Sequence, residues 1–179
     1  MTRRRDLRPA LLSGSLMLIG ACVQQPHAPT NDTVPQLSAA DLQSAEHDVD
    51  AVEAQWNADL AARDAAKVTA HYFAQGFWLS EPDLPAVHDA AGLQARFATA
   101  LADPNFSLVY SPQVTGVSSS DSLAYTRGDF TETLTDPASQ RKTTVRGAYV
   151  TIYVATGLHT WQASEHFASS SGSAVAPGS

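Results

Sequence analysis

Two kinds of hydrophobic spacing divide the chain between residues 38 and 169. In the first part, apolar residues recur every three or four positions, which is typical of amphipathic helices. The clearest run follows Ser38 and Asp41, which suit an N-cap and an acidic first turn, and it ends at Arg63-Asp64. The pattern predicts a long helix there. Its apolar positions are Leu42, Val49, Val52, Trp56 and Leu60.

Two shorter helices and a short strand are expected next. Asp64 is placed to cap one helix and Asp89 the other. Between them, residues 76–80 are predicted to form a short strand that Pro82 ends. The apolar positions of the two helices are Val68, Tyr72 and Phe73 in the first and Leu93, Phe97 and Leu101 in the second.

The second part of the domain has the alternating pattern of β-strands. Turn-rich breaks at 118–122, 136–137 and 156–157 separate four runs, so we expect an antiparallel meander. The expected strands are Phe106–Val117, Leu123–Leu134, Thr143–Ala155 and His159–Ala168. Because the helices precede the strands, the order favours an α+β fold with the helices packed on one face of the sheet.

The segments that flank this domain differ from it in composition. Residues 1–21 carry arginines, then an apolar stretch and small residues, which is the pattern of a secretion signal too short to span a membrane. Residues 22–37 are rich in Pro, Gln, Thr and Asn and are predicted to be a flexible tether. Residues 170–179 are small and polar and are predicted to be a disordered tail. One domain, 38–169, lies between them.

Cys22 is the only cysteine and follows Leu18-Ile19-Gly20-Ala21. The stretch resembles a bacterial lipoprotein box, which implies an acylated Cys22 that anchors the protein to a membrane. The alternative is an ordinary signal cut nearby, which leaves Cys22 as an unpaired thiol. By similarity to lipoprotein sorting, Val23 favours the outer membrane. We therefore expect an exported protein, lipid-anchored to the cell envelope and facing the periplasm.

Charge and composition exclude some partners. From Cys22 onward, 7 Lys and Arg stand against 17 Asp and Glu, a net charge of about −10. Such a surface repels phosphate backbones, so nucleic acid is not an expected partner. His71, His88 and His159 show no metal-ligand spacing. No metal and no cofactor are expected.

Several short motifs resemble those of one family. They are Trp56, Arg63-Asp64, Ala124-Tyr125-Thr126-Arg127-Gly128-Asp129, Arg146-Gly147-Ala148-Tyr149-Val150-Thr151 and Trp161. From about Ser44 to Ser169, the chain resembles the SnoaL-like, "domain of unknown function 4440" branch of the nuclear transport factor 2-like superfamily, which also contains ketosteroid isomerase. The resemblance implies a cone-shaped, curved antiparallel sheet wrapped around the helices, a cystatin-like roll with a pocket at its open end. This fold serves many activities and does not specify one.

The resemblance also implies which side chains surround the cone. These candidate ligand contacts are Trp56, Tyr125, Arg127, Asp129, Tyr149, Thr151 and Tyr153, with His166 beside them. Arg127 and Asp129 also have a simpler interpretation as a structural ion pair. Val150, Ile152 and Val154 would then lie on the outer face, through which relatives commonly dimerise, so a homodimer is expected.

Glu81 stands before Pro82, where the isomerase has its proton-abstracting carboxylate followed by proline. The resemblance therefore makes Glu81, with His166, a candidate catalytic acid–base group. The alternative is a solvated acid beside a turn. The two groups that stabilise the enolate in the isomerase correspond here to Trp56 and Thr151, so steroid chemistry is not implied.

Three functions fit these observations. The first is a membrane-anchored module that binds a small apolar or aromatic molecule in the cone. The second is an isomerase- or hydratase-type enzyme that uses Glu81 or His166 for proton transfer. The third is an accessory domain that docks a partner protein through its outer sheet face.

Overall fold

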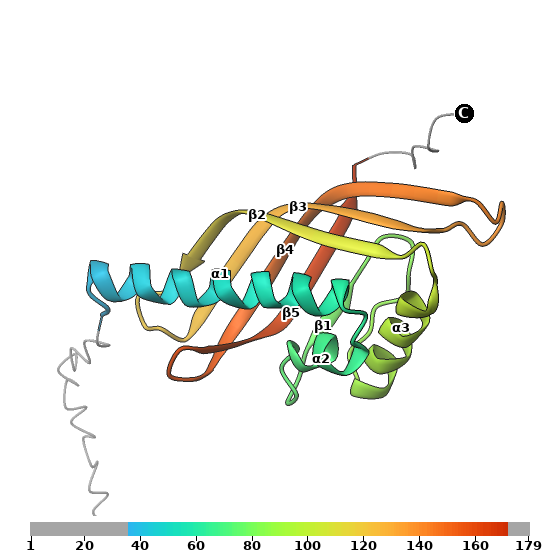
Figure 1. Cartoon of the computed structure of the whole chain (residues 1–179). Coiled ribbons are helices and arrows are strands. Elements are labelled where there is room, and N and C mark those ends of the chain that lie inside the picture. Colours follow the sequence, from blue (N-terminus) through green and yellow to red (C-terminus); the bar gives the residue numbers. More distant parts are fainter. Residues whose placement is uncertain (1–35, 172–179) are drawn as a thin grey trace, which may run out of the picture. The chain divides into compact units, whose positions relative to one another are not determined.

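The computed structural model describes residues 36–171, which form three helices and a five-stranded sheet (Figure 1). The helices are α1 (Ala39–Ala61), α2 (Ala65–Ala70) and α3 (Ala90–Ala102). The strands are β1 (Trp78–Ser80), β2 (Ser107–Val117), β3 (Leu123–Thr135), β4 (Lys142–Gly157) and β5 (Thr160–Ser170). The predicted α+β class is confirmed, and the predicted elements agree with the observed ones to within a few residues.

The predictions for the chain ends fall largely outside residues 36–171. The signal peptide, Cys22 and most of the tether lie outside the described residues, as does the tail from residue 172 onward. Export and lipidation therefore stay predictions. Within the part that the structure describes, no helix is both long enough and apolar enough to cross a membrane.

The sheet has the strand order β1-β5-β4-β3-β2. Strands β2 to β5 form the predicted antiparallel meander, and the short β1 pairs in parallel with β5 at one edge. In Figure 1, α1 runs across one face of the long strands, while α2, β1 and α3 lie together near the end of α1. The helices therefore cover the inner face of the sheet.

Two glycines lie where the backbones of neighbouring strands approach closely. Gly128 pairs with Pro112 beside a β-bulge in β2, and a Cβ on Gly128 would collide with the carbonyl oxygen of Ser111. A Cβ on Gly147 would likewise collide with the carbonyl oxygen of Ser169. Bulges and glycines of this kind bend a sheet.

The predicted helix caps are confirmed. Ser38 and Asp41 form a capping box, in which the Ser38 hydroxyl accepts from the Asp41 N–H at 3.2 Å and the Asp41 carboxylate accepts from the Ser38 N–H at 3.4 Å. Asp64 and Asp89 each accept a hydrogen bond from the backbone N–H three residues later, at 3.1 and 2.8 Å. These local contacts fix where each helix begins.

Helix α2 ends earlier than expected, at Ala70. Tyr72 and Phe73 were predicted to belong to it but lie beyond its end. The backbone there pairs with β5 instead: the Phe73 N–H donates to the Ala163 carbonyl at 2.9 Å, and the Ala163 N–H donates to the His71 carbonyl at 2.8 Å. Pairing with the sheet replaces the helical hydrogen bonds, and Tyr72 still becomes buried.

Arg63 joins the end of α1 to the turn between α3 and β2. It has a left-handed backbone, with φ of 57°. Its guanidinium donates hydrogen bonds to the carbonyl oxygens of Leu101 and Asp103, each at 2.7 Å, Pro104 at 3.1 Å and Phe106 at 2.8 Å. The Arg63 part of the Arg63-Asp64 motif therefore has a structural role.

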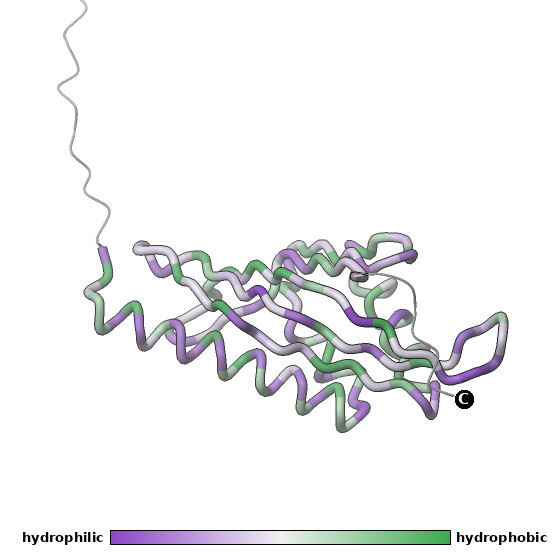
Figure 2. The backbone as a smooth tube through the Cα atoms, turned by 90° about the horizontal axis from the view of Figure 1, so that it is seen from above, coloured by the Kyte–Doolittle hydropathy of each residue, from purple (hydrophilic) through white to green (hydrophobic). Residues whose placement is uncertain are grey.

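Alternation along the strands separates an inner from an outer face, and Figure 2 shows apolar and polar segments alternating along the backbone. The expectation that Tyr125, Arg127 and Asp129 look into the cone is wrong, because all three are exposed on the outer face. Residues opposite each other on neighbouring strands share a face. Since Arg127 pairs with Val150, an inward Tyr149 requires an outward Arg127.

Candidate functional site

Buried aromatic and polar side chains meet between α1 and the inner face of the sheet. We call this set the cone cluster; it consists of Glu53, Trp56, Tyr72, Tyr110, Thr126, Tyr149, Thr151, Tyr153 and His166, each at most 4% exposed. The structure brings together those candidates that point inward, namely Trp56, Tyr149, Thr151, Tyr153 and His166. Their roles toward a ligand stay predictions.

The rings of the cone cluster pack in one continuous group. Trp56 of α1 lies with its ring centroid 5.0 Å from that of Tyr72 and 5.7 Å from that of His166. Tyr110 of β2 packs against two other rings of the group, with centroid distances of 4.8 Å to Tyr149 and 5.0 Å to His166. The aromatic wall therefore runs from the α2 end of the cone to β2 and β4.

A polar row crosses the inner face of the sheet. Thr126, Thr151 and His166 are cross-strand partners on β3, β4 and β5. The Thr151 hydroxyl and His166 Nδ1 are 2.9 Å apart. Burial lowers the pKa of His166 to about 3, because a charged imidazolium loses its hydration there. His166 is therefore neutral at physiological pH.

Glu53 was missed by the sequence analysis. It lies on α1 and is 1% exposed. One carboxyl oxygen, Oε1, accepts hydrogen bonds from the Thr126 hydroxyl and from the Tyr153 hydroxyl at 2.7 Å. Burial raises the pKa of Glu53, and these hydrogen bonds oppose the rise. The sequence does contain a sign of this burial, because the helical spacing places Glu53 on the apolar face of the helix, between Val49 and Trp56.

Five polar atoms of the cone cluster are buried and have no hydrogen-bond partner among residues 36–171. They are Glu53 Oε2, Trp56 Nε1, Tyr72 OH, Tyr149 OH and His166 Nε2. A buried polar group left unpaired costs roughly 1–3 kcal/mol. Folded proteins have few such groups, and functional sites are one of the recognised reasons for them.

A small pocket lies at the open end of the cone. We call it the mouth pocket; it is lined by Glu81, Pro82, Leu84, Leu108, Tyr110, Phe130, Glu132 and Ala168. Its volume is about 20 Å³, enough for about one water-sized group. Tyr110 belongs to both the mouth pocket and the cone cluster, so the two are contiguous.

Glu81 is paired within the mouth pocket. Its Oε2 lies 2.5 Å from Nη1 of Arg96 on α3, with the two side chains 15% and 19% exposed. Nη2 of Arg96 donates to the Pro85 carbonyl at 2.8 Å. Burial raises the pKa of Glu81, and the Arg96 charge partly offsets that rise. The alternative of a solvated Glu81 is wrong, because Glu81 is an ion-paired and largely buried acid.

Glu132 is the second carboxyl of the mouth pocket and, like Glu53, is not among the site residues predicted from the sequence. It lies on β3 opposite Leu108 of β2. Burial first and the neighbouring Glu81 second raise the pKa of Glu132 to about 7, while Arg96 lowers it. A group with this pKa exchanges protons near neutral pH.

Glu81 and His166 do not form an acid–base pair in this structure. The polar partner of Glu81 is Arg96, whereas that of His166 is Thr151. His166 also does not line the mouth pocket. The two candidate catalytic side chains therefore occupy different parts of the cone.

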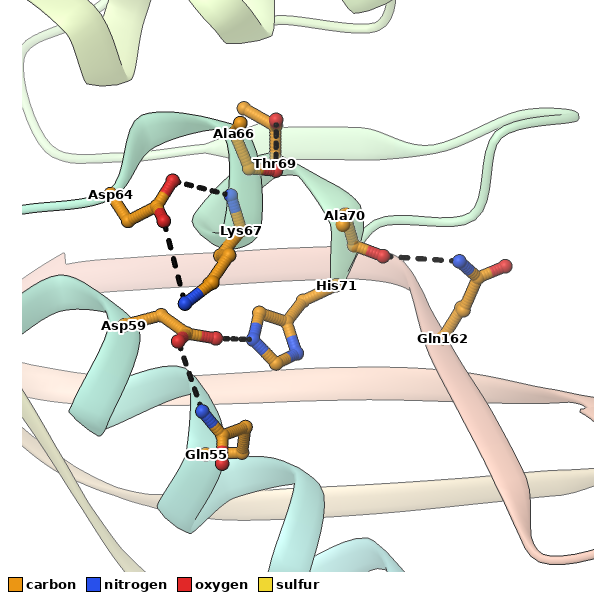
Figure 3. A network of polar contacts seen from close by, with 9 residues as sticks. All are labelled: Gln55, Asp59, Asp64, Ala66, Lys67, Thr69, Ala70, His71 and Gln162. Atoms are coloured by element: carbon orange, nitrogen blue, oxygen red, sulfur yellow. Dashed lines mark hydrogen bonds and ion pairs between the residues drawn. The ribbon is translucent and has the colours of Figure 1, made fainter.

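Another polar network joins α1 to α2 (Figure 3). His71 Nε2 lies 2.9 Å from Oδ2 of Asp59, whose other oxygen accepts from Gln55 Nε2 at 2.9 Å. The pKa of Asp59 is lowered, since the hydrogen bonds from His71 and Gln55 outweigh the opposing effect of burial. Trp56 stacks on His71 at 5.3 Å. This network positions the Trp56 side of the cone cluster.

No group of three or more His, Cys, Asp or Glu side chains in the described part of the chain is arranged to hold a metal ion. No model of a known protein family matches the chain, and no curated protein matches it either.

Solved structures, in contrast, match well. A ketosteroid isomerase-like protein from Erwinia carotovora atroseptica is 19% identical, with a TM-score of 0.59 over 76% of this chain and 100% of that one. A nuclear transport factor 2-like superfamily protein from Salmonella enterica serovar Typhimurium is 7% identical, with a TM-score of 0.58 over 73% and 94%. A type 2 hexachlorocyclohexane dehydrochlorinase is 9% identical, with a TM-score of 0.63 over 79% and 94%.

The chain has the nuclear transport factor 2-like fold. The fold class expected from the sequence motifs is thereby confirmed. In this nuclear transport factor 2-like fold, the mouth pocket and the cone cluster lie on the inner face of the sheet, beneath the helices.

The outer face of the same nuclear transport factor 2-like sheet carries a separate groove of about 470 Å³. We call it the outer groove; it is lined by Gln113, Val114, Arg127, Gly128, Asp129, Ala148, Tyr149, Val150, Phe167, Ala168 and Ser169. Arg127 and Asp129 thus lie together, but outside the cone. Asp129 accepts from Gln113 at 2.6 Å, and no ion pair joins it to Arg127 in the described residues.

Proposed function

We propose that this protein is a SnoaL-like small-molecule-binding module, exported and tethered to the cell envelope through Cys22, whose ligand binds in the cone between α1 and the sheet. The five unpaired polar atoms of the cone cluster carry this proposal. A core selected only for stability would hold apolar groups of similar shape at these positions. A ligand with polar groups gives these atoms their partners.

The side chains around the cone favour an uncharged, aromatic or apolar ligand body. Rings of Trp56, Tyr110 and Tyr149 offer flat apolar surfaces with polar edges. The carboxyl of Glu53 and the imidazole of His166 in the cone cluster both favour the neutral form, since burial raises the pKa of Glu53 and lowers that of His166. A hydroxyl or carbonyl group on the ligand suits such partners.

Mass spectrometry of the full chain purified from its own membrane tests the proposal. We expect a small molecule to co-purify and to be lost or much reduced in Tyr149→Phe, which removes one unpaired hydroxyl. Tyr125→Phe is the matched control, because Tyr125 is 41% exposed on the outer face. The same spectrum reports the acyl chains on Cys22. Absence of any bound molecule, or equal retention in both variants, contradicts the proposal.

A second function, proton transfer of isomerase or hydratase type, is favoured by the two carboxyl groups that line the mouth pocket. Glu81 and Glu132 both have raised pKa values, that of Glu132 being about 7. Incubating the co-purified ligand with the protein in D₂O measures proton exchange directly. Under this proposal the wild type incorporates deuterium into the ligand. The Glu81→Gln variant binds the ligand with unchanged affinity but incorporates no deuterium.

The outer sheet face supports the proposal of a homodimer, or of docking to a partner protein. Apolar side chains around the outer groove are exposed to solvent, among them Phe167 at 40%, and Tyr125 at 41% lies on the same face. Val150 and Ile152 lie between them, as cross-strand partners. A contiguous apolar surface of this kind is typical of protein interfaces.

A further inference from the structure

Two carboxyl groups, Glu81 and Glu132, line the mouth pocket, and among residues 36–171 the cation paired with them is Arg96, which contacts Glu81 from α3. Arg96 uses Nη1 for Glu81 and Nη2 for the Pro85 carbonyl. It acts on Glu132 only through its field, since no ion pair joins the two within residues 36–171. When Glu132 is ionised, the pocket therefore has an excess negative charge.

Two polar groups of the mouth pocket lack partners. The Glu132 carboxyl and the Tyr110 hydroxyl make no hydrogen bond with any residue in the described range. Tyr110 is only 3% exposed, yet it lines the pocket. Glu132 is two residues along β3 from Phe130, the cross-strand partner of Tyr110, so the two side chains share the inner face and line the same pocket. The other walls are apolar, formed by Leu108 and Phe130.

We propose that the mouth pocket binds the primary ammonium group of a small amine, between Glu132 and the Tyr110 hydroxyl. The inference rests on the proposed function, because it names the charged end of that same ligand. The ammonium donates to both oxygens and supplies the missing positive charge, which a desolvated carboxylate requires.

The size of the pocket and the charge of the domain favour the same class of ligand. A volume of about 20 Å³ suits a headgroup of about the size of water, as –NH₃⁺ is, and excludes a quaternary ammonium. The described residues contain 7 Lys and Arg against 16 Asp and Glu. Their field attracts cations to the protein.

Calorimetric titration of the full chain with three probes tests the inference: 2-phenylethylamine, neutral 2-phenylethanol and trimethyl(2-phenylethyl)ammonium. We expect the primary amine to bind at least tenfold more tightly than either other probe. Glu132→Gln should remove this preference. Glu165→Gln, a matched change on the outer face beside Ile152, should keep it.

The pH dependence gives a second measurement. The groups that face Glu132 are Glu81, Arg96 and Tyr110, and with its pKa at about 7 Glu132 gains charge between pH 6 and pH 8. Amine affinity should therefore rise about tenfold over this range, whereas 2-phenylethanol affinity should stay constant.

The outcomes separate this inference from the proposed function. Equal binding of amine and alcohol overturns the ammonium site but leaves a ligand-binding cone. Equal binding of the quaternary probe also overturns it, since general attraction to an acidic surface then explains the binding. If no probe binds, the co-purified molecule decides: a molecule without a primary amine overturns the inference, and the absence of any molecule counts against the proposed function itself.

Discussion

Glu53 places an ionisable group within the apolar face of α1. Its neighbours on that face, Val49 and Trp56, are fully buried, and the hydroxyls of Thr126 and Tyr153 donate hydrogen bonds to it. A carboxylate without a positive partner is costly in such a place, so burial raises its pKa. Protonation of this residue is therefore coupled to folding.

The Glu53→Gln variant should differ from wild type in the pH dependence of its stability. A raised folded-state pKa contributes stability below the unfolded-state pKa and loses it as pH rises through the folded-state pKa. The glutamine side chain of the variant cannot ionise, so the variant should be more stable than wild type at pH 8 and no more stable at pH 4. Urea unfolding at both values measures this, with Glu165→Gln as control. An identical pH profile in Glu53→Gln and wild type would contradict the coupling.

Arg63 illustrates the opposite case, a charged side chain that stabilises backbone. Arg63→Ala removes four hydrogen bonds to carbonyl oxygens, so we expect a loss of about 2–4 kcal/mol in the free energy of unfolding. Arg63→Lys should recover only part, because an ammonium lacks the planar fork. Arg127→Ala, on the exposed outer face, should change stability by less than about 0.5 kcal/mol. Equal effects at both arginines would refute the structural role of Arg63.

At the scale of elements, α1 protects an edge of the sheet. Strand β2 is an edge strand, and edge strands invite pairing with other chains. Asn57 of α1 accepts from the Tyr110 N–H and donates to the Tyr110 carbonyl, each at 2.9 Å. Asp50 accepts from the Thr115 hydroxyl further along β2, at 2.5 Å. Asn57 therefore occupies backbone groups that another strand would use, and Asp50 holds the helix against the same strand through a side chain.

Replacing Asn57 should expose this edge. Asn57→Ala leaves both backbone groups of Tyr110 unpaired, and we expect a loss of about 1–3 kcal/mol together with faster aggregation on heating. Asn57→Asp keeps the acceptor and loses the donor, so its loss should be intermediate. Chemical unfolding and light scattering measure the two effects. If Asn57→Ala and Asn57→Asp behave alike, the two hydrogen bonds between Asn57 and the Tyr110 backbone do not explain the effect.

The elements were largely predictable from the sequence because their signals are local. Ser38, Asp64 and Asp89 cap helices through contacts with residues three positions away, and strand alternation needs only the residues of that strand. The end of α2 was missed because Phe73 pairs with Ala163, which is far away in the sequence. The spacing of apolar residues within one segment cannot predict a contact between distant segments.

At the scale of the whole molecule, the site was predictable only in part. The inward direction of Tyr149 and His166 followed from the resemblance, but Arg127 was assigned to the wrong face because the register between β3 and β4 is not visible in either strand alone. Glu53 and Glu132 were missed for a related reason. Their importance comes from burial, which depends on the packing of α1 and α3 over the sheet.

Assembly belongs to this scale as well. If two copies associate through the outer sheet face, Phe167→Asp places a charge in the interface, and we expect the molecular mass in light scattering to fall from dimer to monomer. Leu158→Asp is the control, because Leu158 is 82% exposed and lies outside the outer groove. A wild type that is monomeric at all concentrations, or a dimer unaffected by Phe167→Asp, would exclude this interface.

The course of α1 has a practical consequence for experiments on this protein. Its beginning lies beside the turn after β2, where the Leu37 N–H bonds to the Ser119 carbonyl, and its end lies beside the start of β2, through Arg63 and Phe106 (Figure 1). The mouth pocket is near that second end. A sensor chip or bead that captures the chain ahead of residue 37 will therefore hold it by the far side and leave the opening accessible to compounds in the flowing buffer.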